Sequence, residues 1–79
     1  MPRKVRELKA DIFKAGAVWR SGKGSHTIWT HPLCPGAQLT LAGNDGDDAK
    51  RYQEKDVQGF LDLIQEAQRK ESELSLKHI

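Results

Sequence analysis

Residues 17–41 read AVWRSGKGSHTIWTHPLCPGAQLTL, and three runs of strand-forming residues in this stretch determine the expected architecture. Residues 17–20 form a short run with β-branched and aromatic side chains, and a Ser-Gly-Lys-Gly turn sequence follows them. Residues 25–31 contain four consecutive strand formers and end before a proline. Pro35-Gly36 fits the central pair of a type II turn, and residues 38–41 alternate polar and apolar side chains. We therefore predict three short antiparallel strands.

An amphipathic helix is predicted on each side of these strands. In residues 3–15, four apolar side chains recur with helical spacing, and Gly16 follows where a left-handed residue closes a helix. The helical period returns from about residue 53 and weakens beyond Arg69. The apolar positions are Val5, Leu8, Ile12 and Ala15 in the first helix and Val57, Phe60, Leu61, Ile64 and Ala67 in the second.

The predicted fold is therefore α+β, in the order α-β-β-β-α. Two amphipathic helices need one apolar surface, and a three-stranded antiparallel sheet offers them one face, which leaves the opposite face open to solvent. Residues 1–70 form a single domain in this interpretation, and residues 71–79 are a helix end or a flexible tail. Residues 42–52 are expected to form a loop, because they are rich in Gly, Asn and Asp.

Composition narrows the class of protein. The 79 residues include one cysteine, so no disulfide forms within the chain. No apolar run approaches the ~18 residues that span a bilayer, and no secretory signal is recognisable at the start. We expect a cytoplasmic protein that binds no membrane. Residues 1–24 carry seven basic and two acidic side chains, a balance that fits a surface facing a polyanion as well as a solvated helix face.

Two arrangements of possible metal ligands are weak. His26, His31 and Cys34 are spaced like three zinc ligands, but a fourth ligand is missing, and we interpret His31 and Cys34 as strand-end and turn residues. The aspartates of residues 43–48 lack the spacing and the final glutamate of a calcium loop. We therefore predict no metal and no cofactor.

The segment with the most chemical potential is the turn at residues 22–26, Gly-Lys-Gly-Ser-His. Its glycines let the backbone approach a ligand and expose successive N–H groups, which suits phosphate oxygens. Lys23 adds a charge, Ser25 adds a hydroxyl donor, and His26 can exchange protons near neutral pH. A Gly-Lys-Gly turn before a strand is also common in ordinary hairpins, so the spacing alone does not establish a function.

Three segments of the chain resemble the HicA family of small toxins from bacterial toxin–antitoxin pairs: residues 14–16 (KAG), 22–26 (GKGSH) and 28–32 (IWTHP). The similarity covers about residues 3–65. It implies a fold like that of a double-stranded RNA-binding domain, and cleavage of messenger RNA by a catalytic histidine without a metal. His26 matches that histidine. The resemblance also implies a HicB-like antitoxin that covers the active face, in a possible hetero-oligomer.

The residues suggest how such a site would work. An imidazole with an ordinary pKa of about 6.5 can take a proton from a ribose 2′-hydroxyl. His26 would then be the general base, or alternatively the acid in a site where water supplies the other half. Lys23, Gly24 and Ser25 would bind the phosphate, and Arg20 and the first-helix lysines would hold the flanking RNA backbone. The acidic residues 43–48, where family members often have basic sequence, would repel phosphate if they lay near the site.

Three questions stay open at this level. Strict alternation places His26 on the same sheet face as Ile28, so either His26 precedes the regular strand or Ile28 faces outward and Trp29 inward. Trp19 and Trp29 are each expected in the core, with base stacking as the alternative. A non-catalytic RNA-binding module would use the same basic residues without His26. A domain that binds only proteins would show no RNA affinity at all.

Overall fold

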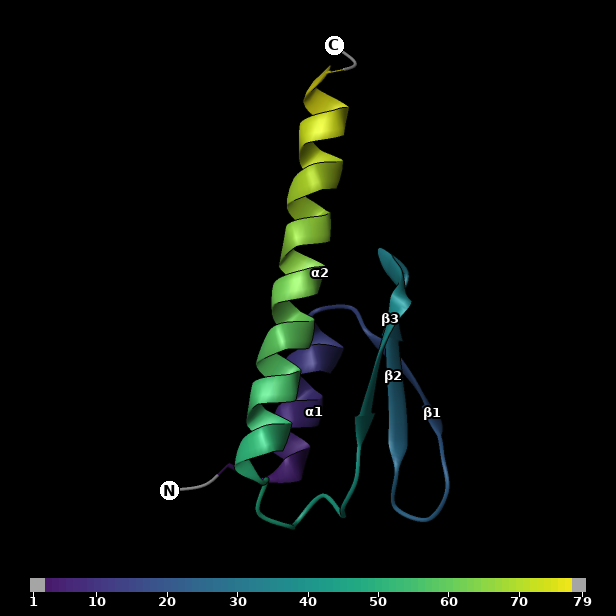
Figure 1. The fold of residues 1–79 in the computed structure, drawn as a ribbon, viewed down its shortest axis with the longest axis vertical. Helices are drawn as coiled ribbons and strands as arrows, with labels where there is room; N and C mark the ends of the chain where they lie inside the picture. Colours follow the sequence, from purple (N-terminus) through teal and green to yellow (C-terminus); the bar gives the residue numbers. More distant parts are fainter. Residues whose placement is uncertain (1–2, 78–79) are drawn as a thin grey trace.

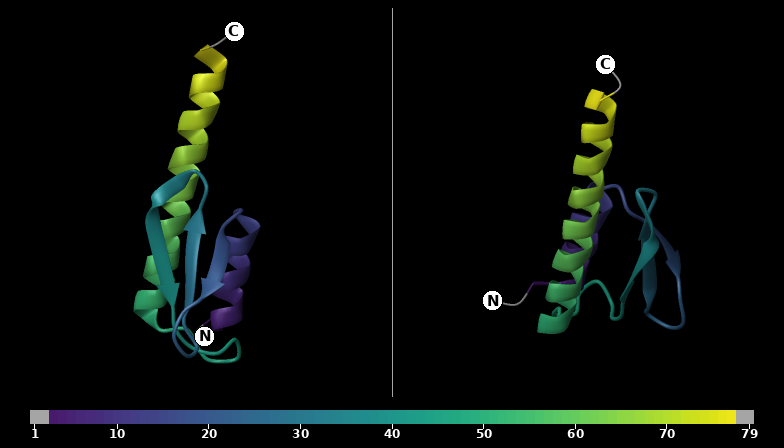
Figure 2. Two further views of the ribbon diagram at one scale, coloured as in Figure 1. Left: turned by 90° about the vertical axis from the view of Figure 1, so that its right-hand side faces the viewer. Right: turned by 45° about the horizontal axis from the view of Figure 1, so that its top comes forward.

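The computed structural model describes residues 3–77 and contains two helices and three strands, which confirms the predicted α+β order (Figure 1). The elements are α1 (Val5–Lys14), β1 (Val18–Ser21), β2 (Thr27–His31), β3 (Cys34–Leu41) and α2 (Arg51–Lys77). The strands form one antiparallel sheet in the order β1-β2-β3. Both helices lie on one face of this sheet, and neither of them covers the opposite face (Figure 2).

The core lies between the sheet and the two helices. The predicted helical stripes supply Val5, Leu8 and Ile12 from α1 and Val57, Phe60 and Ile64 from α2, and all six are buried. The sheet contributes Trp29, Leu39 and Leu41 from its inner face. Burial of each large apolar side chain stabilises the fold by about 1.5–3 kcal/mol, so these contacts hold the helices to the sheet.

The end of α1 is fixed by Gly16, as the sequence predicts. This residue has φ +95°, a left-handed conformation that favours glycine. The Gly16 N–H donates to Phe13 O at 3.0 Å, and the Ala17 N–H donates to Ile12 O at 3.1 Å. The chain thereby turns directly from the last turn of α1 into the sheet.

The prediction of a turn at Pro35-Gly36 is wrong. Both residues lie inside β3, which begins at Cys34 rather than near residue 38. The turn instead occupies residues 32 and 33, and His31 pairs with Cys34 across it. A proline is tolerated at this position because β3 is an edge strand with only one paired side, where a missing N–H costs little.

The second helix is longer than its apolar pattern indicates. It begins at Arg51 and continues to Lys77, so residues 71–77 are helical and residues 78–79 lie outside the described part of the chain. The boundary of the domain at residue 70 stays a prediction. Neither α1 nor α2, over the residues described, combines the length and the apolar character needed to cross a bilayer.

The two tryptophans differ in burial. Trp29 on the central strand is 3% exposed, as expected for a core residue. Trp19 pairs with it across the ladder and shares its face of the sheet, yet Trp19 is 54% exposed, so its predicted core position is wrong. The reason is its place on the edge strand, where the helices do not cover the side chain as they cover Trp29.

Candidate functional site

The turn between β1 and β2 is closed by backbone hydrogen bonds. The His26 N–H donates to Lys23 O at 3.0 Å, and the Gly22 N–H donates to His26 O at 2.9 Å. Gly24 has φ +58°, which the turn requires and which glycine adopts without strain. Within residues 3–77, the N–H groups of Gly24 and Ser25 have no protein acceptor. They are therefore available to a ligand.

The His26 ring is exposed and oriented by its own turn. Its Nδ1 lies 2.8 Å from Lys23 O. A carbonyl oxygen only accepts hydrogen bonds, so Nδ1 carries the hydrogen, and Nε2 of the neutral ring has a free lone pair. No other residue in the described chain bonds to Nε2. The neutral ring therefore has its hydrogen on Nδ1, and its unprotonated Nε2 can act as a base.

Close packing at Gly22 sets the position of His26. A Cβ atom built on Gly22 would lie 3.3 Å from the Cβ of His26 and 3.4 Å from Cδ1 of Ile28, so no larger residue fits without a shift. Ile28 is half-buried, Trp29 points inward, and His26 precedes the first residue of β2. Both explanations given above for the face on which His26 lies therefore hold: His26 precedes the regular strand, and Ile28 faces outward while Trp29 faces inward.

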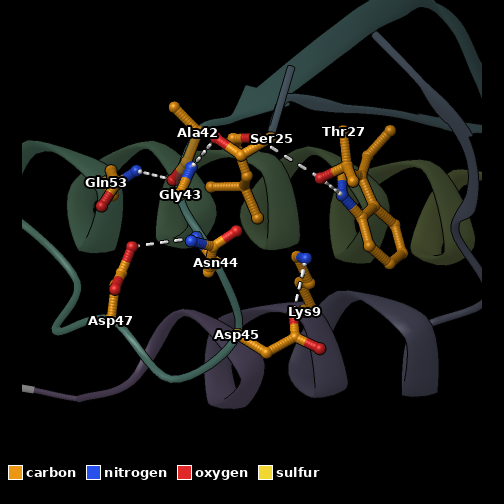
Figure 3. Close-up of polar contacts among 11 residues, drawn as sticks. Lys9, Ser25, Thr27, Ala42, Gly43, Asn44, Asp45, Asp47 and Gln53 are labelled. Carbon is orange, nitrogen blue, oxygen red and sulfur yellow. Dashed lines mark hydrogen bonds and ion pairs between the residues drawn. The ribbon is translucent and has the colours of Figure 1, made fainter. Parts of the chain in front are cut away.

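Ser25 connects the turn to the loop that follows β3. Its Oγ accepts a hydrogen bond from the Gly43 N–H at 3.1 Å (Figure 3). A hydroxyl that accepts in this way still has its own hydrogen to donate, so Ser25 remains able to contact a phosphate oxygen. Sequence analysis missed this contact because the two residues are 18 positions apart.

The two predicted cationic residues of the site are exposed. Lys23 lies in the turn itself, beside Gly24, Ser25 and His26. Arg20 pairs with Ile28 across the ladder, so both lie on the outer, helix-free face of the sheet. Among the described residues neither Arg20 nor Lys23 forms an ion pair. The structure thus gathers four of the five predicted residues in one turn and places Arg20 on the neighbouring strand.

The acidic loop of residues 43–48 binds α1. The Val5 and Arg6 N–H groups donate to Asp47 O and Asp45 O at 2.9 and 3.1 Å, which satisfies free donors at the start of the helix. The Lys9 ammonium contacts Asp45 at 2.6 Å (Figure 3). Lys4 forms an equivalent pair with Asp48. Much of the charge of this loop is therefore neutralised by Lys9 of α1 and by Lys4, which directly precedes this helix.

These ion pairs limit the expected role of the first-helix lysines. Lys4 and Lys9 are occupied by the loop, whereas Lys14 forms no ion pair within the described residues. Arg3 contacts Asp11 at 2.7 Å, and the hydrogen bond that the guanidinium donates to this carboxylate raises the pKa of Arg3. The excess of basic over acidic side chains in residues 1–24 therefore overstates the number of cations that a polyanion can contact.

His31 and Cys34 lie where the interpretation as strand-end residues places them, at the end of β2 and the start of β3. His31 is only 6% exposed. Its Nε2 donates to Ala15 O at 3.0 Å, and its Nδ1 accepts from the Leu33 N–H at 3.0 Å. Both ring nitrogens are thus occupied, and the imidazole joins the end of α1 to the β2–β3 turn.

Comparison with known proteins adds no relative: the chain matches no protein-family model, and no curated protein or solved structure is detectably similar to it.

Proposed function

We propose that this protein is a HicA-like toxin: a metal-independent endoribonuclease that cleaves messenger RNA with His26. The observation that carries the proposal is the His26 ring, which is exposed and whose Nδ1 is held by Lys23 O at 2.8 Å. A base for RNA cleavage needs a free, outward-facing nitrogen on a fixed ring, and Nε2 meets that requirement.

The proposed reaction follows from the groups in the turn. Nε2 of His26 takes the proton of a ribose 2′-hydroxyl, and the resulting 2′-oxygen attacks the adjacent phosphorus. The bond from phosphorus to the 5′-oxygen breaks, and a water molecule supplies the proton to the leaving oxygen. The products are a 2′,3′-cyclic phosphate and a 5′-hydroxyl end. A general base of this kind contributes a rate factor of about 10²–10⁴.

The rest of the turn would stabilise the charge that develops on phosphate. The free N–H groups of Gly24 and Ser25 and the Lys23 ammonium lie in the same few residues as the imidazole. The Ser25 hydroxyl can donate as well, and Arg20 would contact the RNA backbone along the outer face. Such donors, positioned before the substrate binds, require little reorganisation during the reaction.

Two further parts of the proposal concern the cell. A HicB-like antitoxin would neutralise the enzyme by covering the turn and the outer face of the sheet, which neither α1 nor α2 covers. The toxin would act in the cytoplasm, where its messenger RNA substrate lies. A HicB-like reading frame next to the gene, together with growth arrest that this neighbour relieves, would support both parts.

Incubation of the purified chain with a synthetic messenger RNA, with and without EDTA, tests the enzyme. We expect cleavage in both conditions and products that end in 2′,3′-cyclic phosphate. His26→Asn is the informative variant, because its amide can still donate to Lys23 O but cannot act as a base. It should lower the cleavage rate by about 10²–10⁴-fold. Cleavage by His26→Asn at the parent rate would refute the assignment.

The alternative is an RNA-binding module that does not cut. The observation that favours it is that both ring nitrogens of His31 are hydrogen-bonded. Within the described residues, His26 is then the one imidazole with a free nitrogen, so no second histidine is available to act as the acid. A binder would retain RNA affinity in both the parent chain and His26→Asn, and neither would generate cyclic phosphate ends. The same assay therefore separates the two functions.

A further inference from the structure

A groove between α1 and β1 exposes aromatic rings on a chain of 79 residues. Its volume is about 340 Å³, and it is lined by Arg6, Lys9, Phe13, Trp19, Trp29 and Asp45, among others. Phe13 is 63% exposed and Trp19 is 54% exposed. Exposed aromatic side chains gathered in one hollow typically mark a binding site, because water solvates them poorly.

Trp19 presents a platform in this groove. Its ring packs against buried Trp29, with the centroids 6.2 Å apart and the planes tilted by 33°. The indole N–H of Trp29 donates to Thr27 Oγ1 at 2.9 Å, whereas the Trp19 N–H has no acceptor within residues 3–77. Trp19 therefore combines an open ring with a free donor, and its neighbour restricts the movement of the ring.

The charges around the groove favour a nucleotide. Arg6 forms no ion pair among the described residues, while Lys9 is paired with Asp45. A phosphate can therefore bind the Arg6 guanidinium while its base stacks on Trp19, and the Asp45 carboxylate can accept from a base amino group. An apolar side chain of a protein partner would use the rings but leave the guanidinium without a counterion.

We propose that this groove binds one unpaired nucleotide of the RNA strand that is cleaved at His26, so that the substrate is single-stranded. This inference rests on the proposed function. Thr27 also lines the groove and directly follows His26 in the chain, so the groove reaches the end of the sheet that carries the turn. Stacking on an aromatic ring requires a base that is free of its own helix.

The test measures the binding of a fluorescein-labelled ten-nucleotide single-stranded RNA by anisotropy, with all variants built on His26→Asn to prevent cleavage. Trp19→Ala should weaken binding by about 5- to 100-fold, the range for one stacked base. Trp19→Phe, which keeps an aromatic face, should retain most of the affinity. Tyr52→Ala is the matched control, because Tyr52 is 56% exposed at the start of α2 and lies outside the groove, and it should change affinity by less than twofold.

An abasic scan of the oligonucleotide sharpens the result. Removal of the base that occupies the groove should weaken binding by the same factor as Trp19→Ala, and the two changes together should cost no more than either alone. The corresponding RNA duplex should bind without sensitivity to Trp19→Ala. Arg6→Gln, which removes the positive charge and keeps a polar side chain, should reduce the slope of log affinity against log salt by about one.

Failure of this inference differs from failure of the proposed function. A cooperative thermal melt would first show that Trp19→Ala is folded. If that variant then binds single-stranded RNA with the affinity of the parent, the groove does not bind RNA, even if His26→Asn abolishes cleavage. A loss of antitoxin binding with unchanged RNA affinity would also overturn the inference, since the groove would then serve a protein. Conversely, a Trp19 effect without any cleavage by the parent would support the groove and refute the enzyme.

Discussion

His26 and His31 lie five residues apart at opposite ends of β2, and their imidazoles are held in opposite ways. His26 is exposed, with its hydrogen on Nδ1 and a free Nε2. His31 is buried, with its hydrogen on Nε2 and an Nδ1 that accepts from Leu33 N–H. One ring can take a proton from a substrate. The other can only lose a structural hydrogen bond if it is protonated.

The turns beside the two rings account for this difference. The β1–β2 turn contains Gly22 and Gly24, lies at the end of the sheet, and bonds to only one nitrogen of the His26 ring. The β2–β3 turn has only two residues, and the His31 ring beside it reaches Ala15 O after the end of α1, so both ring nitrogens of His31 find backbone partners. The chemistry available to a histidine therefore depends more on its neighbours than on its residue type.

The largest effect on folding is expected at His31. His31→Ala removes a buried side chain and leaves both Ala15 O and Leu33 N–H without their partner. We expect the free energy of unfolding to fall by about 2–4 kcal/mol, measured by urea denaturation. His26→Ala is the control, and it should change that free energy by less than about 0.5 kcal/mol because its ring is exposed. Equal losses in the two variants would remove the distinction between the rings.

Gly16→Ala tests the same contact from the other side. The residue has φ +95°, and a Cβ atom there would lie 3.1 Å from Nε2 of His31. Backbone strain and displacement of the ring should together lower the free energy of unfolding by about 1–3 kcal/mol. Gly59→Ala, where a Cβ atom meets open space on α2, should instead be neutral or stabilising in the same denaturation series.

Gly22→Ala should disturb His26 without disturbing the fold. The new methyl group would press on Cβ of His26 and Cδ1 of Ile28 and shift the imidazole from its position. We expect cleavage to slow by about tenfold, since a small misplacement of a catalytic group is costly. The melting temperature should fall by only a few degrees. Unchanged cleavage would indicate that the position of the ring is not important.

The smallest effect is expected from Ser25→Ala. This change removes the acceptor of the Gly43 N–H, a group on an exposed loop that water can satisfy instead. The free energy of unfolding should fall by less than about 1 kcal/mol. Cleavage should fall by a few-fold, because the turn loses its attachment to the loop and one hydroxyl donor. A loss as large as that of His26→Asn would make Ser25 part of the reaction chemistry.

Local patterns in the sequence were sufficient to predict the order of elements and the turn that carries the candidate site. Helical spacing identified α1 and the packed part of α2, and the glycines around Lys23 indicated the turn between β1 and β2, whereas the face on which His26 lies stayed open. These features depend on residues within a few positions of each other. For the same reason the helix-closing role of Gly16 was predictable.

Features that depend on distant residues were not predictable. Pro35-Gly36 resembles a turn locally, but pairing with β2 extends β3 through it. Trp19 has the character of a core residue, and only the strand order shows that it lies at an edge. The pairing of Asp45 with Lys9 joins residues 36 positions apart, so the charge pattern alone gave no sign that the acidic loop binds α1.

The length of α2 has a practical consequence. Its 27 residues extend about 40 Å, and the last turns project past the sheet at the end opposite the β1–β2 turn (Figure 1). Without partners from the sheet, amide protons should exchange progressively faster from Ile64 towards Lys77. A fluorophore or affinity tag joined there would stand clear of the β1–β2 turn, which makes this projecting helix the preferred attachment point for single-molecule tests of the proposed RNA binding.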